Sequence, residues 1–178
     1  MGAFRNWLSR RDVRRRATQG PARDVVLLGN IWMRGPGRVR LGDGVVLDGS
    51  LAPIELHAHE GAEIVIDADV RVDGGTSIEA RQRVHLGARV RIGAFCKILD
   101  NHYHRPQGAH RRDVPMSSPV TVEEDVVIGA RVLLLPGSHV GRGCVVGPGT
   151  VVTRRVPDFS HVAGFPATVL REAPRGSS

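Results

Sequence analysis

Residues 120–155 read VTVEED, VVIGAR, VLLLPG, SHVGRG, CVVGPG and TVVTRR when they are set out in groups of six. The first residue of each group is small or branched, and the third is aliphatic. The third residues are Val122, Ile128, Leu134, Val140, Val146 and Val152. A period of six fits neither an amphipathic helix nor a simple alternating strand, and it is typical of parallel β-helix repeats. The pattern therefore predicts a β-solenoid in which each hexad contributes one short strand and a turn.

The same pattern predicts how each hexad faces the core. First and third side chains should point inward and stack on those of neighbouring coils. Glycine follows the third position at Gly129, Gly141 and Gly147, where we expect it to permit a tight corner. Both cysteines, Cys96 and Cys144, occupy first positions, so we expect buried thiols that are neither reactive nor joined in a disulfide.

Before residue 120 the repeat is less regular, and it is absent from residues 99–119. Inward pairs recur between residues 39 and 98, with phase slips near residues 50 and 60 that predict bulged corners or small loops. Residues 99–119, LDNHYHRPQGAHRRDVPMSSP, abandon the hexad altogether and are polar and rich in histidine. An excursion of this length inside a regular fold is uncommon and usually functional. We therefore expect the chemistry here, because a histidine that titrates near neutral pH suits general-base catalysis.

The hexads, the histidine-rich interruption and the later stretch VPDFSHVAGFPA (residues 156–167) together resemble one known group of proteins. They are similar to the left-handed β-helix acyltransferases built on the hexapeptide repeat, especially the galactoside, maltose, streptogramin and capsule-polysaccharide O-acetyltransferases. The resemblance covers roughly residues 39–172. It implies an all-β fold, a three-sided left-handed parallel β-helix with a long loop and short terminal segments. The expected divisions are a basic N-terminal segment and cap (1–38), the β-helix (39–158) with its active-site loop (99–119), and a C-terminal tail (159–178).

The resemblance also implies an activity, the transfer of an acetyl group from acetyl-CoA to a hydroxyl of a saccharide or similar small acceptor. Direct transfer is expected because the chain lacks a Gly-x-Ser-x-Gly motif and its cysteines occupy inward positions. By the resemblance His102 is the general base, with His104 the second candidate, and Asp73 and His104 lie near the acceptor. The positions implied for coenzyme A are Ala130, Pro148, Thr153, Arg154 and Arg171.

The assembly implied by the resemblance is a homotrimer with active sites between subunits. If three hexads complete one turn, residues eighteen apart share a face, so Val127 would lie beside Val145 and Leu133 beside Val151. These second-position side chains are aliphatic although they should point outward. Exposed apolar stripes of this kind favour contact with a neighbouring subunit.

Charge and hydropathy limit the other partners. The net charge is +7, but Lys97 is the only lysine among 25 basic residues, a bias that we attribute to genome composition, and no nucleic-acid partner is expected. Residues 4–16 resemble a short basic amphipathic helix, which would either cap the first coil or touch an anionic membrane peripherally. No apolar run approaches the ~18 residues of a membrane span and no signal peptide is apparent, so a cytoplasmic location is expected.

Two other classes of function stay open. A γ-type carbonic anhydrase shares the hexapeptide solenoid and binds zinc through three histidines between subunits. His57 and His59 form a candidate metal pair, but the sequence indicates no third ligand at a fixed spacing, so a solvated or inter-coil role and no metal cofactor are expected. The second class is a non-catalytic scaffold that binds a partner through residues 99–119.

Overall fold

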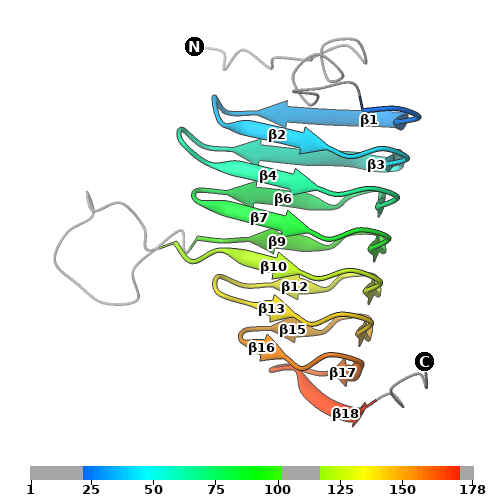
Figure 1. Ribbon diagram of the computed structural model, residues 1–178, viewed down its shortest axis with the longest axis vertical. Helices are drawn as coiled ribbons and strands as arrows, with labels where there is room; N and C mark the ends of the chain where they lie inside the picture. The colour runs from blue at the N-terminus through cyan, green and yellow to red at the C-terminus, as the bar shows by residue number, and fades with distance from the viewer. Residues whose placement is uncertain (1–21, 102–116, 173–178) are drawn as a thin grey trace, which may run out of the picture.

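The computed structural model describes residues 22–101 and 117–172, which form strands and turns without any helix. The strands lie in three columns (Figure 1). The first column holds β3 (Val46–Ala58), β6 (Ser77–Ala80), β9 (Lys97–Leu99), β12 (Leu133–Leu134) and β15 (Val151–Val152). The second holds β5 (Arg71–Asp73), β8 (Arg91–Ile92), β11 (Val127–Ile128), β14 (Val145–Val146) and β17 (Ser160–Ala163). The third holds β2 (Arg38–Leu41), β4 (Glu63–Ile66), β7 (Arg83–Leu86), β10 (Val120–Val122), β13 (His139–Val140) and β16 (Arg155–Val156).

Two further strands complete the described chain. β1 (Val26–Arg34) pairs in parallel with β3, and β18 (Thr168–Glu172) pairs antiparallel with β17. The long strand β3 pairs with both β5 and β6, so it joins the first two columns into one twelve-stranded sheet. The third column is a separate six-stranded parallel sheet. The predicted all-β class with parallel strands is therefore confirmed.

The pairing register confirms the eighteen-residue spacing for the regular hexads. Val127 lies opposite Val145, and Leu133 lies opposite Val151. Upstream turns are longer, since Ser77 pairs with Lys97, twenty residues further on. In that turn the two extra residues fall at the corner between β6 and β7, so the inward positions stay aligned with the next turn.

The inward positions build the core as the hexad pattern predicts. The third-position side chains of residues 120–155 are at most 2 % exposed, and the first-position side chains at most 1 %. Upstream, Leu56 lies opposite Ile78, Ile78 opposite Ile98, and Ile98 opposite Leu134, so these side chains form one ladder in the first column. Burying each such aliphatic side chain stabilises the fold by about 1.5–3 kcal/mol.

The corners obtain their geometry differently from what we expected. Gly129 and Gly141 do not have the left-handed conformation. A Cβ on Gly129 would instead lie 2.7 Å from the Pro148 nitrogen, and one on Gly141 would lie 2.3 Å from Asp158 Oδ1. These glycines therefore leave room for the next turn of the chain. At corners between the third and second columns, a later residue of the corner adopts the left-handed conformation instead. Its φ lies between 56° and 64° at Asp69, Arg89, Asp125, Gly143 and Phe159.

The sheets extend past the division points expected from the sequence. β1 pairs with β3 well before residue 39, and β17 lies beyond residue 158 yet pairs in parallel with β14. Both strands carry inward aliphatics such as Leu27 and Val162, which are buried in the common core. The basic segment 4–16 lies outside the described residues. Because residues 22–101 and 117–172 contain no helix, no described segment is a helical membrane span.

Candidate functional site

The predicted loop leaves the fold at the corner between the first and third columns (Figure 1). Its two ends meet there, since Asn101 forms an antiparallel bridge with Ser117. The fully buried Asp100 carboxylate accepts hydrogen bonds from three successive backbone amides of the preceding turn, at 2.7, 2.6 and 2.8 Å. These amides belong to Arg81, Gln82 and Arg83. Asp100 thus fixes the point at which the chain leaves the regular coil.

Four polar side chains gather at the same corner. Glu79 on β6 is 8 % exposed, and its Oε1 lies 2.8 Å from His59 Nε2. The same oxygen accepts a hydrogen bond from Nδ2 of the fully buried Asn101, at 3.4 Å. The His57 ring stacks on the His59 ring, with centroids 4.1 Å apart. We call His57, His59, Glu79 and Asn101 the corner cluster.

The electrostatics of the corner cluster favour a neutral His57. Partial burial is the main cause that lowers the pKa of His57, and the neighbouring His59 lowers it further. Arg34 and Arg81 act in the same direction, whereas Glu79 opposes them. His57 is therefore uncharged near neutral pH, with a nitrogen available as an acceptor or ligand.

The sequence pattern did not identify Glu79 or Asp100. The candidate pair of His57 and His59 lacked a third partner because Glu79 lies twenty residues further along and reaches His59 only through the pairing of β3 with β6. One signal for Asp100 was available. It is the first polar residue after the inward pair of Cys96 and Ile98, where the hexad stops.

Three of the predicted site residues lie along the corner between the second and first columns. Asp73 ends β5, and its Oδ1 accepts a hydrogen bond from Arg71 Nε at 2.9 Å. Ala130 and Pro148 follow β11 and β14 in the turns below, where the Ala130 oxygen accepts from the Gly149 nitrogen at 2.9 Å. Within the described ranges the Ala130 amide donates to no backbone carbonyl.

The remaining predicted residues lie elsewhere. Thr153 and Arg154 are exposed and follow β15, at the corner that Asn101 and Ser117 occupy two turns earlier. Arg171 belongs to β18, and its backbone pairs with His161. His102 and His104 lie outside the described residues. One chain thus places the described site positions at two different corners and on β18.

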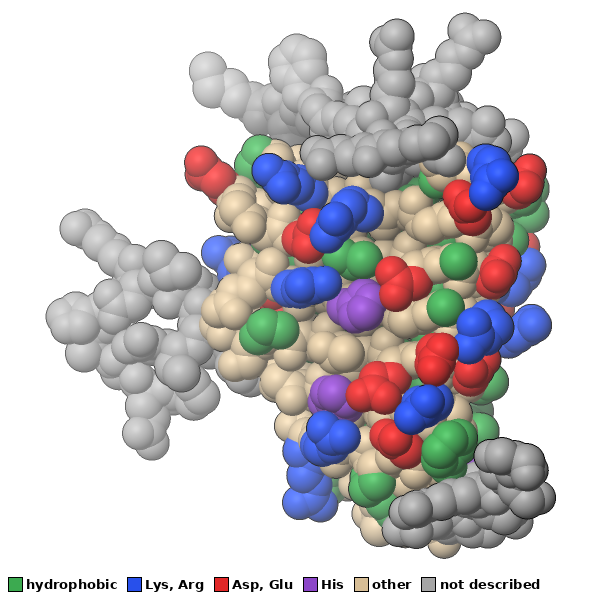
Figure 2. Space-filling view, viewed as in Figure 1, with side chains coloured by type: hydrophobic (Ala, Val, Ile, Leu, Met, Phe, Trp, Pro, Cys, Tyr) green, Lys and Arg blue, Asp and Glu red, His purple; other side chains and the backbone are tan. Residues whose placement is uncertain are grey.

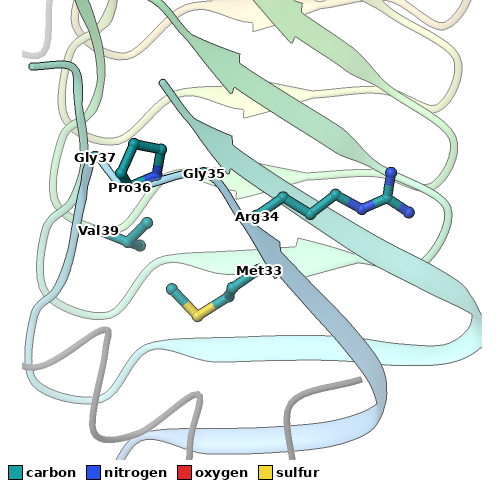
Figure 3. Close-up of a pocket in the computed structure, with 6 residues that line it drawn as sticks. All are labelled: Met33, Arg34, Gly35, Pro36, Gly37 and Val39. Atoms are coloured by element: carbon teal, nitrogen blue, oxygen red, sulfur yellow. The ribbon is translucent and has the colours of Figure 1, made fainter. Parts of the chain in front are cut away.

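A hollow of about 210 Å³ lies where β1 turns into β2 (Figure 3). Met33, Arg34, Gly35, Pro36, Gly37 and Val39 line it. The buried Met33 and Val39 face each other, while Arg34 extends away (Figure 3). Its volume is below the ~300–1,000 Å³ usual for small-molecule sites, and no predicted site residue contributes to it.

Residues 119–154 match the family model described as bacterial transferase hexapeptide (six repeats). The protein carries the hexapeptide repeat. The hexapeptide repeat on which the resemblance rests is thereby confirmed, and the solved structures agree in fold. This hexapeptide-repeat protein superposes on a point mutant of AntD, an N-acyltransferase from Bacillus cereus in complex with dTDP and coenzyme A, with a TM-score of 0.76 and 14 % identity over 97 % of this chain and 93 % of that one. A maltose O-acetyltransferase from Clostridium difficile 630 gives a TM-score of 0.54 and 21 % identity over 97 % and 81 % of the two chains.

Sequence identity to a curated relative covers a short stretch of the chain. The hexapeptide-repeat protein is 48 % identical over 59 residues to 2,3,4,5-tetrahydropyridine-2,6-dicarboxylate N-acetyltransferase of Staphylococcus aureus (strain JH9). That stretch is 33 % of this chain, and it spans only a quarter of the length of the curated relative.

Proposed function

We propose that the protein is an acyltransferase that moves an acetyl group from acetyl-CoA to a hydroxyl of a saccharide or similar small acceptor. The observation that carries this proposal is the combination of a hexapeptide-repeat match with a histidine-rich interruption whose two ends are fixed by Asp100 and the Asn101–Ser117 bridge. AntD, to which the chain is similar in fold, was solved with coenzyme A, which supports the choice of donor.

The proposed chemistry is direct transfer. His102 accepts the proton of the acceptor hydroxyl as the oxygen attacks the thioester carbon, and the thiol of coenzyme A then leaves. The Ala130 amide, which donates to no backbone carbonyl in the described chain, would stabilise the oxyanion. Burial raises the pKa of both cysteine thiols, so neither is suited to form an acyl-enzyme.

We further propose that the columns form a left-handed β-helix and that the protein is a homotrimer. Ala130 and Pro148 lie at one corner, whereas Thr153 and Arg154 lie at another. A coenzyme A site that uses both groups requires two subunits, with one corner from each. Arg154 and Arg171 would then bind the phosphates, while Asp73 and His104 would lie near the acceptor.

His102→Ala tests the proposal. General-base catalysis typically contributes about 10²–10⁴-fold, so acetyl transfer should fall by that order while coenzyme A binding is kept. His104→Ala should cost much less. Abolished transfer in His104→Ala with retained transfer in His102→Ala would show that the base is misassigned. Unchanged transfer in both variants would refute the mechanism.

The acceptor requires a separate experiment. A saccharide hydroxyl is our first choice, and a sugar amine is the second, because AntD is an N-acyltransferase that has been solved with dTDP-4-amino-4,6-dideoxyglucose and coenzyme A. Release of free thiol from acetyl-CoA should be measured across sugars, nucleotide sugars and their amino derivatives. Activity with amino sugars alone would replace O-acetylation by N-acetylation.

The two alternative functions make different predictions. A non-catalytic scaffold would show no thermal shift with coenzyme A, and a γ-type carbonic anhydrase would hydrate carbon dioxide with zinc bound between subunits.

Acidic and basic side chains are interspersed on the face shown in Figure 2, which supports our expectation that nucleic acid is not a partner. A cytoplasmic location, with or without peripheral membrane contact through residues 4–16, remains part of the proposal.

A further inference from the structure

His57, His59 and Glu79 form a compact group of potential ligands that the proposed acyl transfer does not use. One ligand atom from each residue can be chosen so that all three atoms lie within 4.8 Å of one another. His57 and His59 are two residues apart, and Glu79 stands opposite His57 in the pairing of β3 with β6. We propose that these three side chains bind a divalent transition-metal ion, and that zinc is the ion which suits them best.

The donor set matches the chemistry of zinc. Imidazole nitrogen and carboxylate oxygen both bind zinc, with bonds of about 2.0–2.2 Å. Ligand atoms around such an ion lie about 3.3 Å apart, as tetrahedral geometry with these bond lengths requires. His59 Nε2 and Glu79 Oε1, at 2.8 Å, separate slightly to admit the ion, and His57 closes on it by side-chain rotation. Three protein ligands leave a fourth position for water or a further ligand.

Asn101 supplies the outer contact that such a site needs. Its amide donates to the Glu79 carboxylate, and hydrogen-bonded carboxylates of this kind are typical around metal ions. Asn101 Oδ1 is buried and has no hydrogen-bond partner among residues 22–101 and 117–172. That oxygen is available to accept a hydrogen bond from water on the ion.

The surrounding charges make the site selective among metal ions. Arg34 and Arg81 lie close enough to affect His57, and Arg34 also pairs with Glu55 at 3.9 Å. These two cations repel other positive ions, so attraction to negative charge alone would not hold a metal ion here. The binding energy therefore comes from coordination to the imidazole nitrogens. Zinc and cobalt should therefore bind, whereas magnesium and calcium, which prefer oxygen ligands, should not.

The chain contains a matched control within the same fold. His85 Nε2 lies 2.8 Å from Asp67 Oδ2, and His139 Nε2 lies 2.7 Å from Glu123 Oε1. Each pair repeats the hydrogen bond between His59 and Glu79. Within the described chain, neither pair belongs to a group of three potential ligands.

The test uses the full chain without an added histidine tag. Zinc binding should be measured by calorimetry and equilibrium dialysis for the wild type, His57→Gln, His59→Gln, the double variant and His85→Gln, with magnesium in parallel. Loss of an outer-shell partner costs about 10–100-fold in metal affinity, so loss of a ligand should weaken zinc binding by at least about 100-fold. His85→Gln should bind zinc as the wild type does, and magnesium should bind to none of them.

Two controls make the result decisive. Thermal unfolding of the metal-free variants shows whether they fold, and zinc should raise the unfolding temperature of the wild type and His85→Gln but not of the double variant. Zinc binding that survives in the double variant but is lost when His102 and His104 are both replaced would overturn the assignment. Equal binding by every variant, or no binding by the wild type, would also overturn it. None of these measurements depends on acyl transfer, so the two proposals fail separately.

Discussion

Thr150 fills a first position of a hexad, where most neighbouring turns place valine or cysteine. Its side chain is fully buried, and its hydroxyl has no hydrogen-bond partner in the described part of the chain. A buried hydroxyl without a partner is costly, so Thr150→Val should stabilise the fold by about 1 kcal/mol in urea unfolding. Thr153→Val, at an exposed site, should change the free energy of unfolding by less than about 0.5 kcal/mol. A destabilised Thr150→Val would mean that the hydroxyl has a partner.

The two thiols are predicted to be unreactive in the folded protein. Burial raises the pKa of Cys96 and Cys144, which lowers the fraction of thiolate at any pH below that pKa. Cys96 Sγ donates to the Gly129 oxygen at 3.1 Å, and Cys144 Sγ to the Pro157 oxygen at 2.9 Å. Ellman's reagent at a pH of about 8, near the ordinary pKa of a thiol, should react with both thiols rapidly in denaturant and far more slowly in the native state. Rapid native reaction of either thiol would contradict its buried position.

At the scale of the element, alanine substitutions can show why glycine follows the aliphatic position. The two explanations are close stacking of neighbouring turns and freedom of the glycine backbone. If the glycines are needed for close stacking, Gly129→Ala should destabilise more than Gly147→Ala. A Cβ on Gly129 would lie 2.7 Å from the backbone of the next turn, whereas one on Gly147 would lie 3.2 Å from the Ala163 side chain. Overpacking predicts a loss of about 1–3 kcal/mol for Gly129→Ala and a smaller loss for Gly147→Ala. Equal losses in urea titrations would instead favour backbone freedom as the cause.

The strands and their stacking were predictable wherever the hexad is regular. From residue 120 the inward and outward positions followed from the hexad pattern, and the eighteen-residue register followed from the resemblance, which implies three hexads in each turn. Upstream, the number of residues per turn varies, so adding hexads could not reveal that Glu79 adjoins His59. Asp100 was missed for a related reason, since its partners are backbone amides of the preceding turn, which carry no side-chain signal. The loop histidines were found by composition, and their geometry lies outside the described residues.

At the scale of the whole molecule, the short apolar stripe on the second column tests the trimer. Val127 and Val145 are 44 % and 37 % exposed, between Arg91 in the turn above and His161 in the turn below. If these valines meet a neighbouring subunit, Val145→Arg should yield monomers or aggregates in light scattering. Thr121→Arg, on the third column, is the matched control and should leave the assembly intact. A trimer that tolerates Val145→Arg would place the interface elsewhere.

β18 affects whether copies of the protein can join end to end. A column of parallel strands ends in a row of unpaired backbone groups, and another chain can add a strand there and lengthen it without limit. β18 runs antiparallel along β17, the last strand of the second column, and the turn before it also bonds to Val151 of the first. Within the described chain, reversing the direction of this strand ends the second column with an antiparallel edge, so a further parallel coil cannot continue that column in register. At the second column the hairpin should therefore act as a terminator, opposing the end-to-end growth that a stack of parallel repeats would otherwise allow.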